Sequence, residues 1–475
     1  MRTNTFVKKY VGTGQFYKSL LVVMLPILIQ NGITNFISLL DNVMVGQVGT
    51  EQMSGVSIVN QLLMIFYLCV FGAVSGAGLF GAQFFGRNDG EGMRSTFRFK
   101  LYISLFMYAV AMTVFLTLGE PLVGLYLHEG GETGDLTLTM HYAKEYLAVA
   151  LWGLFPYTLT QVYASSLREV KHTLPPMVAG IVGVVINSVL NYLLIFGAFG
   201  LPRMGVRGAA LATVIARFVE CLLALLWTHL HTGDCPFIQG VYRTLRIPRV
   251  LMRRILLTGL PLIANEALWS AGQAALLQCY SYRGLAVVSA MNISNIVSNT
   301  FAVLYLSMGT TISILVGHRL GAGKLREARE DANRMIAFSI LLGLIAAGLI
   351  AICATFFPGI YNTTEEVKLL ATEFTLVIAL ASPLHAIINA SYFTLRSGGK
   401  TLLTFLFDSV YVWGVSVILA FVLSYFTSIP ILTVYLIVQM VDIFKCILGI
   451  ALVNSGIWVR DITGGAACEP TENEV

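Results

Sequence analysis

Long apolar segments recur along almost the whole chain, and they constrain its fold more than any other feature. Each is about 20 residues or longer, which is enough for a helix to cross the hydrocarbon core of a bilayer. Of 475 residues, 56% are hydrophobic and 12% are charged, so the chain has more apolar surface than a soluble core could bury. We therefore predict an all-α integral membrane protein with about twelve spans, at residues 20–45, 55–80, 101–119, 142–165, 176–199, 208–230, 255–280, 287–316, 335–357, 369–394, 401–426 and 430–455.

Basic residues alternate between the predicted loops, which gives the chain an orientation in the membrane. Most of the 30 lysines and arginines fall in the N-terminal segment and in the loops after even-numbered spans. Cytoplasmic loops near span ends are enriched in such residues, so we expect both termini in the cytoplasm. The net charge of +5 follows from this bias and does not indicate a nucleic-acid partner.

The second half of the chain repeats the first. When the sequence is aligned with itself at an offset of 235 positions, Pro26 matches Pro261 and Gly86 matches Gly321. At an offset of 228, Arg168 matches Arg396. An even number of spans per repeat keeps both halves in the same orientation, and such repeats usually bind substrate at their interface. We predict tandem six-helix lobes at 1–230 and 255–460, a basic cytoplasmic linker at 231–254 and a cytoplasmic tail at 461–475.

Two pairs of opposite charges lie three residues apart inside predicted spans. Arg217 precedes Glu220, and Asp442 precedes Lys445. Residues at this spacing share one face of a helix, and a charge in lipid costs about 3 kcal/mol or more unless it is paired. We interpret both as structural pairs that neutralise themselves.

Three other carboxylates inside the spans, Asp41, Glu266 and Asp408, have no basic residue within a helical turn along the chain. An unpaired carboxylate in a low-dielectric site can exchange a proton near neutral pH, and among neutral oxygens it can hold a hard cation. Either event changes the charge inside lipid and biases two conformations. These residues are our candidates for coupling ion movement to transport.

Polar side chains recur at helical spacing on several spans that are otherwise apolar. Such stripes line a hydrated interior, or they hold helices together by hydrogen bonds. We predict that a substrate pathway is lined by Tyr146, Asn31, Gln161, Gln273, Asn292, Asn295 and Asn389.

Several segments resemble the bacterial multidrug and toxic compound extrusion (MATE) transporters, and the resemblance covers essentially the whole chain. They are ISLLDNVMVGQVG around Asp41, GIVGVVINSVLNYLLIFG around Asn187, GVRGAALAT ending at Thr213, and GLPLIANEALW around Glu266. The resemblance implies two six-helix bundles arranged as a V. It also implies a secondary antiporter that exports drugs, toxins or metabolites by alternating access, in the bacterial cytoplasmic membrane.

In the family pattern, Asp41 matches the acid of the N-terminal lobe. The resemblance implies Asn187, Asn191 and Thr213 as its partners in a cation or proton site, with Tyr146 beside them. One branch of the family has an aspartate at the position of Asn191, so the amide lowers the charge of this site.

Glu266 matches the acid of the C-terminal lobe in the bacterial multidrug branch. The aspartate that accompanies it in that branch is His385 in this chain. We predict a second cation or proton site in which Asp408 replaces that aspartate, joined by His385, which can titrate near neutral pH. The alternative for His385 is a neutral, hydrogen-bonded core residue.

The resemblance implies Na+ or H+ as the coupling ion, with no cofactor and no ATPase subunit, and we expect a monomer. Each arginine or lysine inside a span has an acid nearby in the sequence, which favours a cationic or neutral organic substrate.

The main alternative is a flippase for lipid-linked saccharides of the same superfamily, which would need a cationic cavity. A membrane-embedded enzyme is less favoured because the sequence contains no HExxH or GxSxG motif, and a channel would need rings of equivalent charges.

Overall fold

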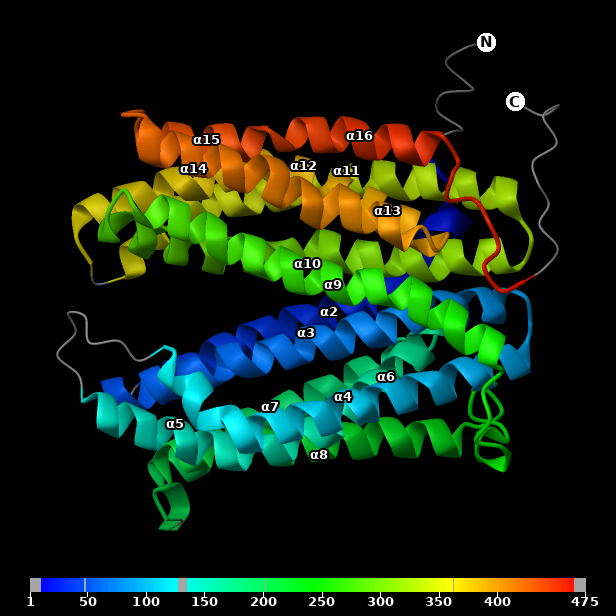
Figure 1. Ribbon diagram of the computed structural model, residues 1–475, viewed down its shortest axis with the longest axis horizontal. Coiled ribbons are helices and arrows are strands. Elements are labelled where there is room, and N and C mark those ends of the chain that lie inside the picture. Colours follow the sequence, from blue (N-terminus) through cyan, green and yellow to red (C-terminus); the bar gives the residue numbers. More distant parts are fainter. Residues whose placement is uncertain (1–9, 47, 127–134, 201, 362, 465–475) are drawn as a thin grey trace. The chain divides into compact units, whose positions relative to one another are not determined.

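The computed structural model describes residues 10–46, 48–126, 135–200, 202–361 and 363–464, apart from the side chains of residues 37–43, 50 and 285. In this part of the chain the regular structure is entirely helical. Eleven of its helices are long and apolar enough to cross a membrane, so the predicted all-α membrane fold is confirmed. Figure 1 shows the main helices: α2 (Gly14–Gly46), α3 (Thr50–Gly86), α4 (Gly90–Gly124), α5 (Leu136–Ala150), α6 (Leu154–Glu169), α7 (Leu174–Phe196), α8 (Gly205–Leu230), α9 (Arg249–Ser281), α10 (Leu285–Gly321), α11 (Leu325–Ala354), α12 (Glu365–Ser397), α13 (Thr401–Phe405), α14 (Ile418–Phe426), α15 (Ile431–Met440) and α16 (Asp442–Asn454).

The predicted fourth span, at 142–165, is built from two shorter helices. α5 and α6 are joined by one turn of 3-10 helix, η1 (Leu151–Gly153), without a break in the helical backbone. Pro156 has no N–H to donate to the preceding turn, and a tighter turn next to a proline is a common adjustment. Neither helix is long enough to cross a bilayer comfortably alone, but together they supply the twelfth crossing.

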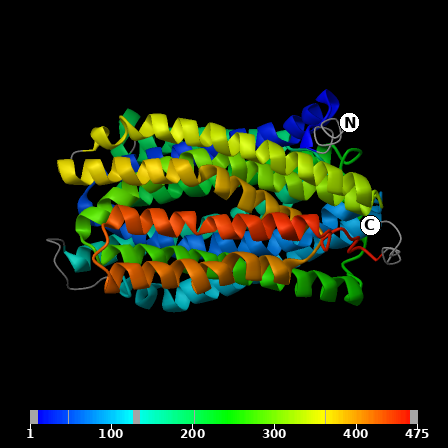
Figure 2. The same cartoon turned by 90° about the horizontal axis from the view of Figure 1, so that it is seen from above.

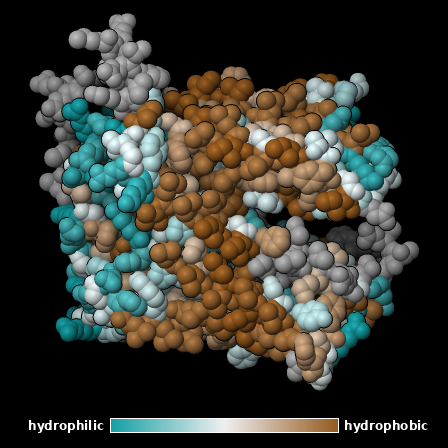
Figure 3. Space-filling view, turned by 180° about the vertical axis from the view of Figure 1, so that it is seen from behind, coloured by the Kyte–Doolittle hydropathy of each residue, from teal (hydrophilic) through white to brown (hydrophobic). Residues whose placement is uncertain are grey.

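Large apolar side chains cover the outer faces of the helices. On α4, Phe106 and Leu116 are 60% and 69% exposed. Figure 3 shows apolar residues along the lengths of the helices, while hydrophilic residues gather towards their ends. A soluble protein rarely exposes so much contiguous apolar surface, so these faces are suited to contact with lipid.

The chain folds into two compact units. Unit 1 consists of Met1–Leu28, Leu79–Asp89 and Arg254–Val475, and unit 2 consists of Ile29–Gly78 and Gly90–Arg253. The units differ from the lobes predicted at 1–230 and 255–460, because the first part of α2 and the last turns of α3 pack with the C-terminal repeat. The predicted lobe boundaries describe the duplication, and they stay a prediction.

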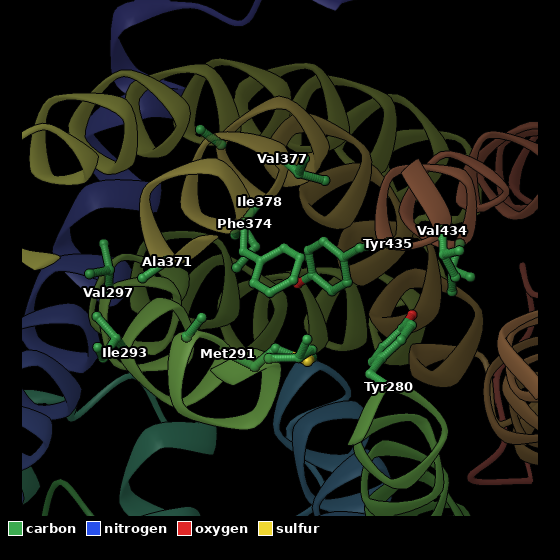
Figure 4. Packing of buried hydrophobic residues seen from close by; sticks show 14 of the residues in the cluster. Tyr280, Met291, Ile293, Val297, Ala371, Phe374, Val377, Ile378, Val434 and Tyr435 are labelled. Atoms are coloured by element: carbon green, nitrogen blue, oxygen red, sulfur yellow. The ribbon is translucent and has the colours of Figure 1, made fainter. Parts of the chain in front are cut away.

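Unit 1 has an apolar core in which aromatic rings from three helices meet (Figure 4). Phe374 of α12 packs against Tyr435 of α15 with 4.9 Å between ring centroids, and Tyr280 of α9 lies 5.5 Å from the Tyr435 ring. Residues of α10, including Met291, complete the cluster. Figures 1 and 2 show α10, α11 and α12 running side by side around this core.

In unit 2, glycines allow α7 and α8 to approach closely. A Cβ added at Gly208 would lie 2.7 Å from the carbonyl oxygen of Leu194, and one added at Gly183 would lie 3.3 Å from that of Ala216. Small residues at such crossings are typical of helices that pack in membranes. The close approach brings polar side chains of α7 and α8 within hydrogen-bonding reach.

Part of the linker predicted at 231–254 is an apolar, buried segment. Cys235, Phe237 and Ile238 are buried, and the Phe237 ring lies 5.2 Å from that of Phe97 on α4. Burial raises the pKa of the Cys235 thiol to about 12, so the side chain stays neutral at physiological pH. These contacts anchor the linker to unit 2.

Residues with left-handed backbone recur at the two shifts that relate the halves of the sequence. They are Gly49 (φ 156°) and Gly284 (123°), Asn88 (59°) and Gly323 (74°), and Lys171 (66°) and Gly399 (70°). This conformation favours glycine and is uncommon for lysine. The same turn is therefore kept in both repeats even where the residue has changed, which confirms the tandem duplication.

Two glycines form a reciprocal contact between α3 and α10 within unit 1. A Cβ added at Gly86 would clash with the carbonyl oxygen of His318, and one added at Gly321 would clash with that of Gln83. The shift of 235 relates Gly86 to Gly321 and Gln83 to His318. Ala82 and Gly317 are also related by this shift, and they face each other. A Cβ added at Gly317 would lie 2.9 Å from the Cβ of Ala82.

We expect the substitution Gly321→Ala to destabilise the protein by about 1–3 kcal/mol, because its new methyl group meets a backbone carbonyl that cannot rotate away. Gly348→Ala on α11 is the matched control, since nothing lies within 4 Å of a Cβ there. Thermal unfolding of the purified protein in detergent measures both. If both variants melted at the wild-type temperature, the reciprocal contact would not contribute to stability.

Candidate functional site

Polar side chains of α7 and α8 form a hydrogen-bonded chain inside unit 2. The amide of Asn187 donates to the hydroxyl of Thr213 at 3.1 Å, and the amide of Asn191 donates to the carbonyl oxygen of Asn187 at 3.3 Å. Asn187 and Asn191 are 6% and 1% exposed. Thr213 donates in turn to the backbone carbonyl of Ala209 at 3.1 Å. The structure therefore brings together three of the predicted N-terminal site residues.

Asp41, the predicted acid of this site, lies on α2, and its side chain is outside the described residues. Tyr146 of α5 is buried, and its hydroxyl donates to the side-chain oxygen of Asn60 on α3 at 3.2 Å. Asn60 was not predicted as a site residue. Asn295, which the offset of 235 matches to Asn60, was predicted as a site residue. The duplication was therefore the signal that could have identified Asn60.

In unit 1, Asp408 is paired with a lysine from another helix. The Lys445 ammonium of α16 donates to Asp408 Oδ1 at 2.8 Å, and the two side chains are only 5% and 16% exposed. Lys445 therefore has its salt bridge with Asp408 and not with Asp442, so the predicted structural pair Asp442–Lys445 is wrong. The spacing of three placed both groups near one helix face, but a partner on a neighbouring helix gives the closer contact.

Asn265 of α9 connects this salt bridge to other helices. Its amide nitrogen donates to Asp408 Oδ2 at 3.0 Å and lies 3.2 Å from the Tyr392 hydroxyl of α12. Ser409 donates to the Asn265 side-chain oxygen at 2.7 Å. Asp408 and Ser409 lie in a π-helical turn, η5 (Leu406–Val410), a conformation that often occurs at functional sites. Sequence reasoning missed Asn265, which directly precedes Glu266 in the chain.

Glu266 also has a basic partner, contributed by α12. Arg396 Nη1 lies 4.0 Å from Glu266 Oε1, and the arginine side chain is 1% exposed. The same guanidinium donates to the Tyr392 hydroxyl at 3.4 Å. Glu266 and Asp408 thus lack basic neighbours along the chain but have them in space, because the partners come from α12 and α16.

The third acid of this region, Asp442, lies beside His385. His385 Nε2 is 3.6 Å from Asp442 Oδ2. The predicted pair Arg217–Glu220 in unit 2 does form, at 3.1 Å, and that prediction is confirmed. Each of these three acids of unit 1 lies beside a different basic residue. Tyr392 and Asn265 connect two of the pairs, those of Glu266 and Asp408.

This pairing limits what the unit 1 cluster can bind. A cation bound to these carboxylates would be repelled by Lys445 and Arg396, which lie within 4.0 Å of them. Among the residues that the structure describes, no group of three or more His, Cys, Asp or Glu side chains is arranged to hold a metal ion. The roles predicted for Glu266, Asp408 and His385 as a cation or proton site stay a prediction.

The predicted substrate-lining residues differ in exposure. Gln273, Asn292 and Asn295 are exposed on α9 and α10, both of which are long enough to cross the membrane. The others are half-buried or buried, namely Asn31, Tyr146, Gln161 and Asn389. Exposed amides at membrane depth are costly in lipid, so water or substrate is their expected surrounding.

We expect Lys445→Met to destabilise the protein by about 3–5 kcal/mol, because it leaves Asp408 buried without its counter-ion. The double variant Asp408→Asn/Lys445→Met should recover most of that loss, since both charges are then gone. Thermal unfolding of the two single variants and the double variant gives the coupling energy. Arg326→Met is the control, because the Arg326 side chain is 95% exposed. Strictly additive effects would contradict the salt bridge.

Comparison with protein families gives one match in each half of the chain. A model described as MatE matches residues 26–193 and 261–426. The two matched segments correspond to the two repeats, and together they cover more than half of the chain.

Several curated proteins are similar over most of their length. "Probable multidrug resistance protein YoeA" of Bacillus subtilis is 23% identical over 420 residues, which is 88% of this chain and 89% of that protein. "Probable multidrug resistance protein NorM" of Thermotoga maritima is 24% identical over 450 residues, 93% of each chain. The protein of the same name from Shewanella oneidensis is 27% identical over 417 residues, covering 86% and 87%.

Solved structures share the fold. One is described as the outward-facing conformation of a multidrug resistance MATE family transporter of the MOP superfamily; it has a TM-score of 0.83 and 18% identity, covering 92% of this chain and 96% of that one. A MATE structure in a straight conformation has a TM-score of 0.83 at 19% identity, covering 92% and 96%. One in a bent conformation has a TM-score of 0.82 at 19% identity, covering 93% and 96%.

Proposed function

The chain belongs to the MatE family and is a multi-pass membrane transporter rather than an enzyme, and from this premise we propose that it is a secondary antiporter. It exports small amphipathic organic compounds by alternating access in exchange for Na+ or H+. It lies in the cytoplasmic membrane of a bacterium as a monomer, with both termini in the cytoplasm. The relatives named as multidrug resistance proteins support this proposal.

The observation that carries the proposal is the buried polar chain of Asn187, Asn191 and Thr213 in unit 2. Buried amides and hydroxyls in a membrane need a polar partner, and the proposed partner is the carboxylate of Asp41. Neutral oxygens around one carboxylate can stabilise either a bound Na+ or a proton. With an amide at Asn191, the site has one negative charge, which suits a monovalent coupling ion.

The charges of the membrane region favour a cationic or neutral substrate. Arg217, Arg396 and Lys445 each lie within 4.0 Å of a carboxylate. A basic side chain that is already neutralised attracts an anionic substrate weakly. A saccharide-phosphate flippase would need bases that are not neutralised in this way, so the observed pairing argues against that alternative.

The position of Pro26 fits a mechanism of alternating access. Pro26 lies inside α2 and cannot donate a backbone hydrogen bond. The boundary between the two units crosses the same helix after Leu28. A helix weakened at this point can bend as one unit moves, which suits the conformational change that an antiporter requires.

A Na+ gradient and a pH gradient are imposed separately on proteoliposomes that contain the wild-type protein. We expect one of the two gradients to drive efflux of a fluorescent organic cation. The gradient that works identifies the coupling ion. Asp41→Asn should reduce gradient-driven efflux to the level of empty vesicles, because the site loses its only proposed charge.

Glu366→Gln is the matched control for this experiment. It removes a carboxylate from the exposed first turn of α12, and its efflux should equal that of the wild type. Asp41→Asn protein that transports normally would refute the coupling role. A wild-type protein that responds to neither gradient would favour the flippase.

A further inference from the structure

The chain between Cys235 and Asn265 contains no acidic residue but five arginines, namely Arg243, Arg246, Arg249, Arg253 and Arg254. The first four lie in unit 2. They follow the buried apolar segment of the linker and continue into the start of α9. This is a dense run of uncompensated positive charge.

Basic residues near the starts of α4 and α11 have acidic partners. Arg94 and Arg98 both contact Glu91, at 2.8 and 3.0 Å, and Arg326 contacts Glu330 at 3.3 Å. The structure gives no ion pair to Arg243, Arg246, Arg249 or Arg253 within its described residues, and all four are exposed. Four exposed arginines within eleven residues thus lack an acidic partner among the described residues.

The backbone of this segment is held by α4, which directs its side chains outward. Arg98 Nε donates to the carbonyl of Val241 at 2.8 Å, and the Tyr102 hydroxyl donates to that of Leu245 at 2.9 Å. With its carbonyls bound to the protein, the segment presents its side chains to the surroundings. The Leu245 side chain is 67% exposed.

Exposed apolar residues alternate with the arginines. Leu245, Val250 and Met252 are 67%, 66% and 39% exposed. Basic and apolar side chains together suit the interface of a bilayer, where arginines reach phosphate groups and apolar side chains enter the acyl region. A soluble polyanion would leave these apolar groups in water.

The start of α9 adds an electrostatic reason for an anionic partner. Arg249 and Arg253 lie one turn apart on the same face, and the first turn contains no acid. Like charges at this spacing repel each other, and the positive end of the helix dipole opposes them further. A phosphate beside them would relieve both effects.

We propose that residues 242–253 bind the headgroups of anionic phospholipids in the leaflet on that side of the membrane. The segment is fixed in place by α4, and its four unpaired arginines contact lipid phosphates while Leu245, Val250 and Met252 insert beneath them. This proposal concerns lipid binding and does not depend on the transported substrate or the coupling ion.

Native mass spectrometry of the full-length protein, incubated with equal amounts of phosphatidylglycerol and phosphatidylcholine, tests the proposal. Wild-type protein should retain phosphatidylglycerol preferentially. Each arginine near an anionic surface contributes about fivefold in affinity. The double variants Arg243→Gln/Arg246→Gln and Arg249→Gln/Arg253→Gln each remove two arginines, so each should lower that preference by about 25-fold.

Lys324→Gln/Arg326→Gln is the control of equal charge, because these residues are exposed and already paired with Glu327 and Glu330. Its lipid preference should equal that of the wild type, and melting temperatures confirm that all variants fold. The proposal is overturned if the arginine variants keep the wild-type preference, or if the control loses as much. It also fails if millimolar inorganic phosphate displaces the lipid, since the site would then bind soluble anions.

Discussion

No water is available in the hydrocarbon core of a bilayer, so every polar group buried there away from a hydrated cavity must find its partner within the protein. The backbone meets this demand by forming helices. The side chains meet it by pairing between helices, as Lys445 does with Asp408 and Arg396 does with Glu266. The amides and hydroxyl of Asn187, Asn191 and Thr213 form a chain for the same reason. Structure and candidate chemistry therefore share one physical origin.

The duplication supplies the scaffold, and differences between the repeats supply the chemistry. Turns with left-handed backbone recur in register at Asn88 and Gly323. The polar clusters do not recur: the chain of Asn187, Asn191 and Thr213 in unit 2 is neutral, whereas the cluster of unit 1 joins Glu266 and Asp408 to basic residues. Asp408 is already neutralised by Lys445 at 2.8 Å, whereas the amides and hydroxyl of the unit 2 chain carry no charge. The two repeats therefore differ in the chemistry of their buried polar groups.

Much of the fold followed from the sequence, because span length and repeat register are local or periodic properties. The hydrogen-bonded grouping of Asn187, Asn191 and Thr213 was also predictable, since these residues match a family pattern. Pairing between helices was not. The spacing of Asp442 and Lys445 suggested a pair along one helix, but the contacts of Lys445 depend on where the π-helical turn places Asp408. Asn265 was missed because an amide next to an acid has no distinctive spacing. Such contacts depend on tertiary packing, which one sequence read alone does not specify.

The reciprocal glycine contact has a consequence for how this chain could have arisen. Gly86 meets residue 318 while Gly321 meets residue 83, and residues 82 and 317 face each other. This is the contact pattern of an isologous interface, in which two copies of one chain use the same patch. In a homodimer of half-length chains, a single glycine codon would have created both close approaches at once. After a fusion of two such copies each glycine would be a separate genetic position, so the symmetry would have to be preserved by two independent residues.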